Sequence, residues 1–259
     1  MSDRPAPPGS GTRTVVRMTA VCCAAISVTA LIFGAVPAGA RELAPIDGYG
    51  RLSDETRVSY WAHPLRGAKV RARPRPRGRV ITRLHLATEL GSPEIYLVLS
   101  RRRAPTGDDW LLLRLPKRPN GTTGWVREST LGALHRVRTQ LVIVRPKLRA
   151  SLYYRKRLIW RADIGIGRSG TETPKGRFYI REGLRLGDGN GPYGAHAFGT
   201  SAYSENLSDW PGGGVVGIHG TNEPQLIPGR ISHGCVRVSN PKVRRLRKKM
   251  PLGTPVWIR

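Results

Sequence analysis

The sequence predicts a mainly β protein with two β-rich domains, the first of them a small barrel. Its 259 residues suffice for one or two domains, and 39% of them are hydrophobic, enough to form a core. The 31 glycines and 21 prolines favour short strands joined by turns over long helices. Short runs rich in Val, Ile, Leu and Trp recur between such turn signals from Tyr60 to the end of the chain.

Residues 1–40 have the pattern of an export signal. Arg13 and Arg17 precede an apolar run over residues 18–36, and Ala38-Gly39-Ala40 is a cleavage site of the small-x-small type. The run is also nearly long enough to span a bilayer, so an uncleaved membrane anchor is the alternative. In both cases the remaining residues are expected outside the cytoplasm. Residues 41–59 show no periodicity and are interpreted as a linker.

The formal net charge of +27 at pH 7 indicates anionic surroundings or an Arg-rich, solvated surface. Two basic runs, at residues 71–76 and 244–249, have a composition that nucleic acid would also attract. Because the chain is expected to be exported, nucleic acid is not the predicted partner. Anionic cell-wall polymers are the expected polyanion, and membrane contact is expected only through residues 18–36 if they stay uncleaved.

Residues 60–134 form the first predicted domain. Five short strands separated by Pro- and Gly-containing turns predict a small barrel. The order of Val-Arg, Val-Ile, Trp-Leu and Gly-Trp-Val resembles bacterial SH3-like domains, which implies a wall-docking or spacer role. The expected strands cover residues 69–72, 79–82, 94–99, 110–114 and 124–126.

Residues 138–259 form the second predicted domain, with a short helix over residues 241–250 that has Pro241 in its first turn. The Gly-rich stretch 186–214 has few periodic signals and is interpreted as a lid or binding loop. Tyr203 and Trp210 within it suit either a lid or a packing role. The expected strands cover residues 140–144, 152–154, 158–164, 177–180, 215–219 and 254–259, the second and third paired as a hairpin.

The stretch from Gly217 to Asn240 carries the residues best suited to chemistry. If residues 1–40 are removed, Cys235 is the single cysteine left, and no intrachain disulfide can form. A thiol beside a histidine is a candidate nucleophile, because the imidazole can take its proton. His219 lies sixteen positions before Cys235, so the chain must turn back to bring them together. We expect the backbone N–H groups of Gly234 and Cys235 to face the developing oxyanion.

A zinc site built from His219, His233 and Cys235 is the alternative interpretation of the same residues. Structural zinc usually takes four ligands, several of them cysteines, and no further ligand spacing is present. We therefore expect no metal.

His219-Gly220-Thr221 and Ser232-His233-Gly234-Cys235-Val236-Arg237 resemble the signature of the L,D-transpeptidase (YkuD-type) catalytic domain. Further matches are Thr-Pro-Lys-Gly-Arg-Phe at 173–178 and Gly-Thr-Pro-Val-Trp-Ile at 253–258. The resemblance covers roughly residues 138–259. It implies a mainly β, sandwich-like catalytic fold with short helices and no metal or organic cofactor.

The resemblance also implies roles for individual residues. Cys235 would be the nucleophile and His219 the general base and then acid, with its ring oriented by the Gly220 carbonyl. His233 and Gly234 would support the Cys235 loop and the oxyanion, and Ser232 and Asn240 would fix that loop by hydrogen bonds. Arg237 would pair with a substrate carboxylate, its alternative role being a solvated charge on a strand.

The expected function is a secreted cysteine L,D-transpeptidase of peptidoglycan tetrapeptide stems. It would form an acyl-enzyme on Cys235, release D-alanine and pass the acyl group to a stem amine to form a cross-link. Two alternatives stay open: an L,D-carboxypeptidase with water as the acceptor, and a non-catalytic cell-wall-binding protein.

Overall fold

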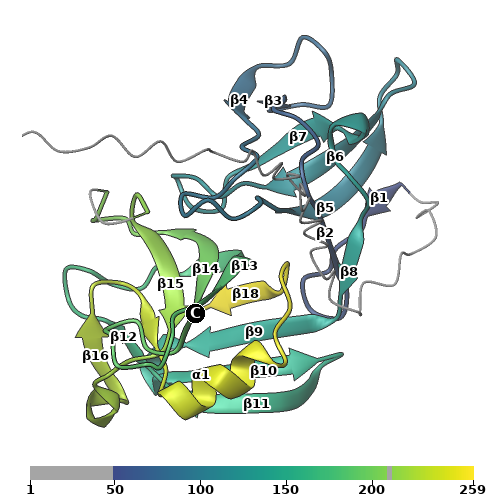
Figure 1. The fold of residues 1–259 in the computed structure, drawn as a ribbon. Coiled ribbons are helices and arrows are strands. Elements are labelled where there is room, and N and C mark those ends of the chain that lie inside the picture. Colours follow the sequence, from purple (N-terminus) through teal and green to yellow (C-terminus); the bar gives the residue numbers. More distant parts are fainter. Residues whose placement is uncertain (1–48, 209–211) are drawn as a thin grey trace, which may run out of the picture. The chain divides into compact units, whose positions relative to one another are not determined.

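The computed structural model describes residues 49–208 and 212–259, all within one compact unit that spans Ala40–Arg259. The expected signal or anchor, together with residues 41–48 of the expected linker, lies outside the described residues. The described chain folds into two sheets with one short α-helix, which confirms the mainly β prediction (Figure 1). No helix in these residues has the length and apolar composition needed to cross a bilayer.

The N-terminal sheet has eight strands and contains all five strands predicted for this part. Seven of them follow the order β4-β3-β7-β6-β5-β2-β8, and β1 pairs with β5. The SH3-like assignment of this sheet stays a prediction. Its elements are β1 (Gly50–Arg51), β2 (Ser59–Ala62), β3 (Lys69–Arg71), β4 (Val80–Arg83), β5 (Tyr96–Arg103), β6 (Asp109–Arg114), β7 (Thr123–Arg127), the 3-10 turn η1 (Glu128–Thr130) and β8 (His135–Val137).

Residues 50–59, expected to belong to a linker, pack against this sheet. Ser53 is buried and donates a hydrogen bond to the carbonyl of Val98. Glu55 is also buried and forms an ion pair of 2.7 Å with Arg114. These are single polar contacts to residues distant in sequence, so no periodic pattern predicts them.

The C-terminal sheet has ten strands in the order β11-β10-β9-β18-β13-β14-β15-β17-β12-β16. Strands β15 and β17 run parallel, as do β18 and β9 and also β12 and β16. Its elements are β9 (Thr139–Val144), η2 (Arg145–Lys147), β10 (Arg149–Tyr154), β11 (Arg157–Asp163), β12 (Gly165–Gly167), β13 (Gly176–Arg185), β14 (His196–Tyr203), β15 (Val215–His219), η3 (Pro224–Leu226), β16 (Gly229–Ser232), β17 (Val236–Arg237), α1 (Asn240–Arg247) and β18 (Pro255–Ile258).

Strand β14 lies inside the Gly-rich stretch that was expected to be a loop. It pairs antiparallel with β13 on one side and β15 on the other, so it is a central strand. Seven of its eight residues are buried, and small residues occupy much of it. A strand buried on both faces has no alternation of polar and apolar residues, and β14 also lacks the continuous run of Val, Ile and Leu that marks the equally buried β9.

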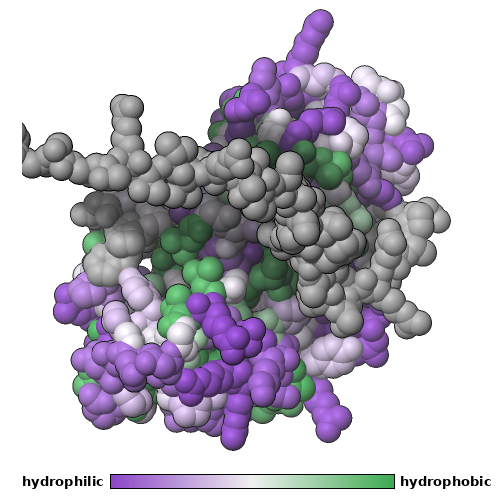
Figure 2. Space-filling model, in the orientation of Figure 1, coloured by the Kyte–Doolittle hydropathy of each residue, from purple (hydrophilic) through white to green (hydrophobic). Residues whose placement is uncertain are grey.

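Helix α1 begins one residue before the predicted helix, and Pro241 lies in its first turn. Val243 and Leu246 are fully buried and join the main hydrophobic cluster of the C-terminal sheet. The other side of the helix carries Lys and Arg, and the surface over α1 and β11 in Figure 2 is largely hydrophilic.

Three hydrophobic clusters stabilise the described chain. One belongs to the C-terminal sheet and one to the N-terminal sheet. A third, smaller cluster joins Ile95 and Leu97 of the N-terminal part to Tyr179 of β13, all three fully buried. The two sheets therefore share a packed apolar contact as well as separate cores.

Candidate active site

The parallel pair β15–β17 brings the two halves of the central stretch together. Ile218 lies opposite Val236 and His219 lies opposite Arg237. Cys235 immediately precedes β17, and its Sγ accepts a hydrogen bond from the N–H of Gly217 at 3.3 Å. The connection through η3 and β16 thus returns the chain so that residues distant in sequence become neighbours.

Gly217 is the point at which the thiol and the imidazole meet. A Cβ atom placed on this glycine would lie 3.7 Å from Sγ of Cys235 and 3.8 Å from Cδ2 of His219. The missing side chain therefore leaves the space that sulfur and ring share. Both groups face a cavity of about 360 Å³.

The His219 ring is buried and held in a defined orientation. Its Nδ1 lies 2.6 Å from the carbonyl oxygen of Gly220, with 4% of the residue exposed. Because a carbonyl can only accept, Nδ1 carries the proton and Nε2 is left as the basic nitrogen. This is the tautomer that can take a proton from a thiol. The ring of Tyr193 packs against the imidazole at 5.0 Å between centroids.

Both reactive groups are neutral at pH 7. Burial lowers the pKa of His219 to about 4; the charge of Arg237 acts in the same direction, while the Gly220 carbonyl opposes it. Burial also raises the pKa of the Cys235 thiol, opposed by the Gly217 N–H and by the charge of Arg237. The resting pair is therefore a thiol beside a neutral base, and the proton moves only when sulfur attacks.

The rate of Cys235 alkylation by iodoacetamide tests the lowered pKa of His219. Because the base is lost only when pH falls through about 4, we expect a plateau that continues below pH 6 and declines near pH 4. A second rise is expected at alkaline pH, above the usual thiol range, as the thiol itself ionises. The measurement is mass spectrometry of the peptide that contains Cys235, with circular dichroism at each pH.

The variant His219→Gln is the control for that profile and should lose the plateau while keeping the alkaline rise. An inflection near pH 6.5 in the parent protein would instead mean that the imidazole titrates at its ordinary pKa, and would contradict the lowered pKa of His219.

The loop that carries Cys235 is fixed by buried hydroxyl groups. Ser232 Oγ donates to the carbonyl of Cys235 at 2.6 Å and accepts the N–H of Gly234 at 3.2 Å. Thr173 Oγ donates to the Gly234 carbonyl at 2.7 Å and accepts the N–H of Gly167 at 2.9 Å. Gly234 has φ +121°, which only glycine adopts readily. The expectation that the Gly234 N–H faces an oxyanion is not met in this arrangement, because that N–H points to Ser232.

Two further side chains, those of His233 and Arg237, line the same cavity with partners of their own. His233 Nε2 lies 2.7 Å from Nη2 of Arg168. Arg237 Nη1 donates to Glu223 at 2.9 Å, so the expected substrate-binding cation already has a carboxylate neighbour. Asn240 bonds three backbone groups, accepting from Ala195 N–H and donating to the carbonyls of residues 189 and 221, all at 3.0 Å.

Sequence reasoning missed three contributors to the site. Thr173 was part of a motif without an assigned role, and Gly217 was part of a strand. Tyr193 lies in the Gly-rich stretch, in which the sequence singles out only Tyr203 and Trp210. Tyr203 is buried, with its hydroxyl bonded to Glu89, and Trp210 lies outside the described residues.

Among residues 49–208 and 212–259, no three His, Cys, Asp or Glu side chains are grouped to hold a metal ion.

Comparison with known proteins identifies the second sheet. Residues 138–258 match the L,D-transpeptidase catalytic domain family, YkuD. A Bacillus licheniformis protein named as an L,D-transpeptidase, YkuD, is 36% identical over 107 residues, which are 41% of this chain and 57% of that protein. Its Bacillus subtilis counterpart is 37% identical over 95 residues, 37% of this chain and 50% of that protein.

This chain thus spans only about half the length of these curated relatives. Among solved structures, an Enterococcus faecium L,D-transpeptidase variant is 22% identical, with a TM-score of 0.37, over 47% of this chain and 49% of that one. Residues 138–258, which carry Cys235, His219 and the strands that bring them together, belong to the L,D-transpeptidase (YkuD) catalytic domain family.

Proposed function

We propose that this chain is an exported cysteine L,D-transpeptidase that acts on the tetrapeptide stems of peptidoglycan. The observation that carries the proposal is the meeting of Sγ and imidazole over Gly217, with Nδ1 of His219 bonded to a carbonyl. Export rests on the pattern of residues 1–40, and the wall substrate rests on the family of residues 138–258.

In the acylation step, Nε2 of His219 takes the thiol proton as Sγ of Cys235 attacks the carbonyl that precedes the terminal D-alanine. The Cys235 N–H is the backbone donor proposed for the oxyanion. The C–N bond then breaks, and the imidazolium returns the proton to the leaving amine, so D-alanine departs and a thioester remains.

In the second step, a stem amine attacks the thioester. His219 takes a proton from this amine as the new amide bond forms; the C–S bond then breaks, and the imidazolium returns the proton to Sγ of Cys235, which regenerates the thiol. Nothing is oxidised or reduced, and the reaction needs no metal or organic cofactor. Arg237 is proposed as a ligand of a stem carboxylate through Nη2, while its Nη1 stays with Glu223.

The basic surface is proposed to hold the protein on anionic wall polymers. Helix α1 carries three arginines in its last turn, and the whole chain has a net charge of +27. Such an interaction would weaken as salt concentration rises.

The test incubates the purified full-length chain with disaccharide-tetrapeptides and analyses the products by mass spectrometry. Cross-linked dimers together with free D-alanine support the transpeptidase. Monomers shortened by D-alanine alone indicate the carboxypeptidase. Unchanged substrate contradicts both enzymatic functions and favours a wall-binding protein.

Gly217→Ala should separate chemistry from folding. A methyl group there would be in ordinary contact with both Sγ of Cys235 and the ring of His219, so it fits but fills the space between them. We expect D-alanine release to fall about tenfold or more, because small displacements of reacting groups are costly. The melting temperature should stay the same or rise slightly, since alanine is less flexible than glycine in a strand. Unchanged turnover would contradict this geometry.

A further inference from the structure

One wall of the thiol cavity is held by the N-terminal sheet. Ser204, Leu207, Gly214 and Val215, all lining the cavity, come from the connection between β14 and β15. We name residues 204–208 and 212–215 the pocket wall. Its contacts to the rest of the chain include a loop between β6 and β7, residues 115–122, which belongs to the other sheet.

Arg118 binds three carbonyl groups of this region. Its Nε donates to Ser204 O at 2.9 Å, and its Nη2 donates to Leu207 O at 2.7 Å and to Gly213 O at 3.0 Å. A guanidinium presents its donors in a fixed plane, so the three acceptors are held in one mutual arrangement. The same group lies over the ring of Tyr203 at 5.0 Å.

Asn120 fixes the residue from which the pocket wall begins. Its Nδ2 donates to Tyr203 O at 2.7 Å, and its Oδ1 accepts the N–H of Tyr203 at 3.0 Å. The side chain therefore pairs with the end of β14 as a neighbouring strand would. Directly after it, Ser204 N–H bonds Gly214 O at 2.8 Å and closes the wall on itself.

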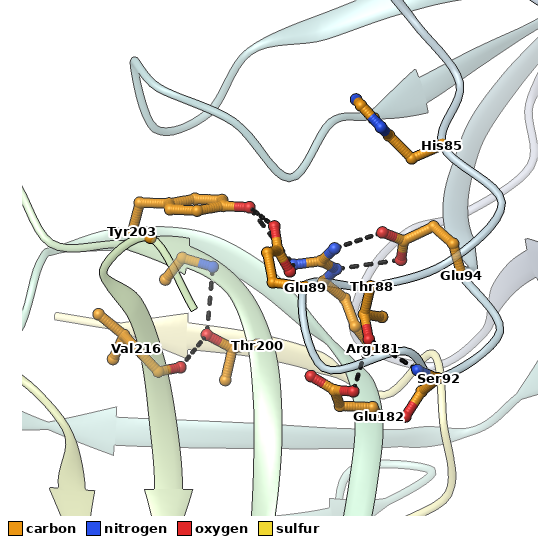
Figure 3. Close-up of polar contacts among 12 residues, drawn as sticks. His85, Thr88, Glu89, Ser92, Glu94, Arg181, Glu182, Thr200, Tyr203 and Val216 are labelled. Carbon is orange, nitrogen blue, oxygen red and sulfur yellow. Dashed lines mark hydrogen bonds and ion pairs between the residues drawn. The ribbon is translucent and has the colours of Figure 1, made fainter. Parts of the chain in front are cut away.

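The other end of Tyr203 is anchored in a buried polar cluster between the sheets (Figure 3). Its hydroxyl donates to Glu89, which pairs with Arg181 at 3.0 Å, and Arg181 also pairs with Glu94. Arg181 and Glu94 are almost completely buried. Tyr203 is thus held at its backbone by the 115–122 loop and at its hydroxyl by residues fixed in both sheets.

We propose that Arg118 and Asn120 are positioning residues for the thiol cavity, so that the N-terminal sheet is part of the catalytic unit. They touch neither Cys235 nor His219 through any hydrogen bond seen among the described residues, and they act through the backbone of the pocket wall. The wall sets the width of the space beside the thiol in which a stem peptide would lie. The role in substrate binding rests on the proposed function.

The test compares Arg118→Ala, Arg118→Lys and Asn120→Asp in the full-length chain. Arg83→Ala is the matched control, because Arg83 is an exposed arginine on β4 of the same sheet. Three quantities are measured: hydrogen exchange of peptides covering the pocket wall, kcat and KM for D-alanine release, and the rate of Cys235 alkylation by iodoacetamide.

Arg118→Ala is expected to raise exchange in the pocket wall about tenfold and to raise KM by a similar factor or more. Alkylation of Cys235 should stay within about twofold, because the thiol and its base are untouched. Arg118→Lys should give exchange rates and a KM between those of the parent and of Arg118→Ala, since lysine keeps the charge but loses the planar guanidinium. Asn120→Asp should raise exchange as well, because it replaces the donor to Tyr203 O by a carboxylate oxygen.

Parent-like exchange and KM in Arg118→Ala and Asn120→Asp would overturn the proposal. The proposal would also be overturned if D-alanine release fell only in proportion to the melting temperature, with Cys235 alkylation altered and hydrogen exchange raised across the whole chain. That pattern indicates general destabilisation. If the parent itself releases no D-alanine, the proposed function fails. Hydrogen exchange, which needs no substrate, then still decides whether these residues order the pocket wall.

Discussion

Cys235→Ala should abolish D-alanine release from tetrapeptide stems while the protein stays folded. Removing a covalent nucleophile commonly costs a factor of about 10⁴ or more in turnover. The fold should tolerate the change, because the half-buried thiol gives up only the hydrogen bond from Gly217 N–H. Turnover is measured by chromatography of released D-alanine, and folding by circular dichroism and thermal melting.

His219→Gln provides the companion measurement, with an expected loss of about 10²- to 10⁴-fold for removal of the general base. Here the thiol is intact but lacks the group that takes its proton. Equal D-alanine release from the Cys235→Ala variant and the parent would refute the covalent mechanism outright.

Arg181→Met should be the most destabilising of the single substitutions considered, with a cost of roughly 3–5 kcal/mol in the free energy of unfolding. The change leaves Glu94 buried without its cation, at 1% side-chain exposure. It also removes the pairing with Glu89 (Figure 3). Urea denaturation followed by intrinsic tryptophan fluorescence gives the difference in unfolding free energy.

Arg103→Met is the matched control for Arg181→Met. Its ion pair with Asp109 joins two residues within one hairpin, and 61% of the Arg103 side chain is exposed, so Arg103→Met should lower the free energy of unfolding far less than Arg181→Met does. The double variant Arg181→Met/Glu94→Gln should recover part of the loss, because the almost completely buried carboxylate of Glu94 is then replaced by a neutral amide. If Arg181→Met and Arg103→Met lower the free energy of unfolding equally, the buried cluster around Arg181 stabilises the fold no more than an exposed ion pair does.

The site was the more predictable part of this molecule. Cys235, His219 and Gly220 stand in short motifs whose residue types are needed for the chemistry, so composition and spacing carry the information. Two of the supporting groups, Thr173 and Ser232, also lie in those motifs. Gly217 was not predicted because a glycine in a strand has many explanations. Only the structure shows that the space beside its Cα lies next to Sγ of Cys235 and the ring of His219.

The fold was predictable where strands contain runs of Val, Ile, Leu or Trp, as β6 and β9 do. Strand β14 was missed because it is built largely of small residues and lacks such a run, and β12, β16 and β17 were missed because they have only two to four residues. The contacts between the sheets could not be predicted from one sequence. Arg181 and Glu94 are 87 positions apart, and Asn120 and Tyr203 are 83 apart, so no local pattern links them.

The cluster around Arg181 has a practical consequence for anyone who shortens this chain. A fragment that starts at residue 138 would lack Glu89 and Glu94. Tyr179 and the unpaired cation of Arg181 would then be exposed to solvent. Such a fragment is expected to express poorly or to associate with itself through the uncovered patch. Inhibitor screening and crystallisation are better served by a boundary before Gly50, and fragment hits found on a shorter version should be checked again on the longer one.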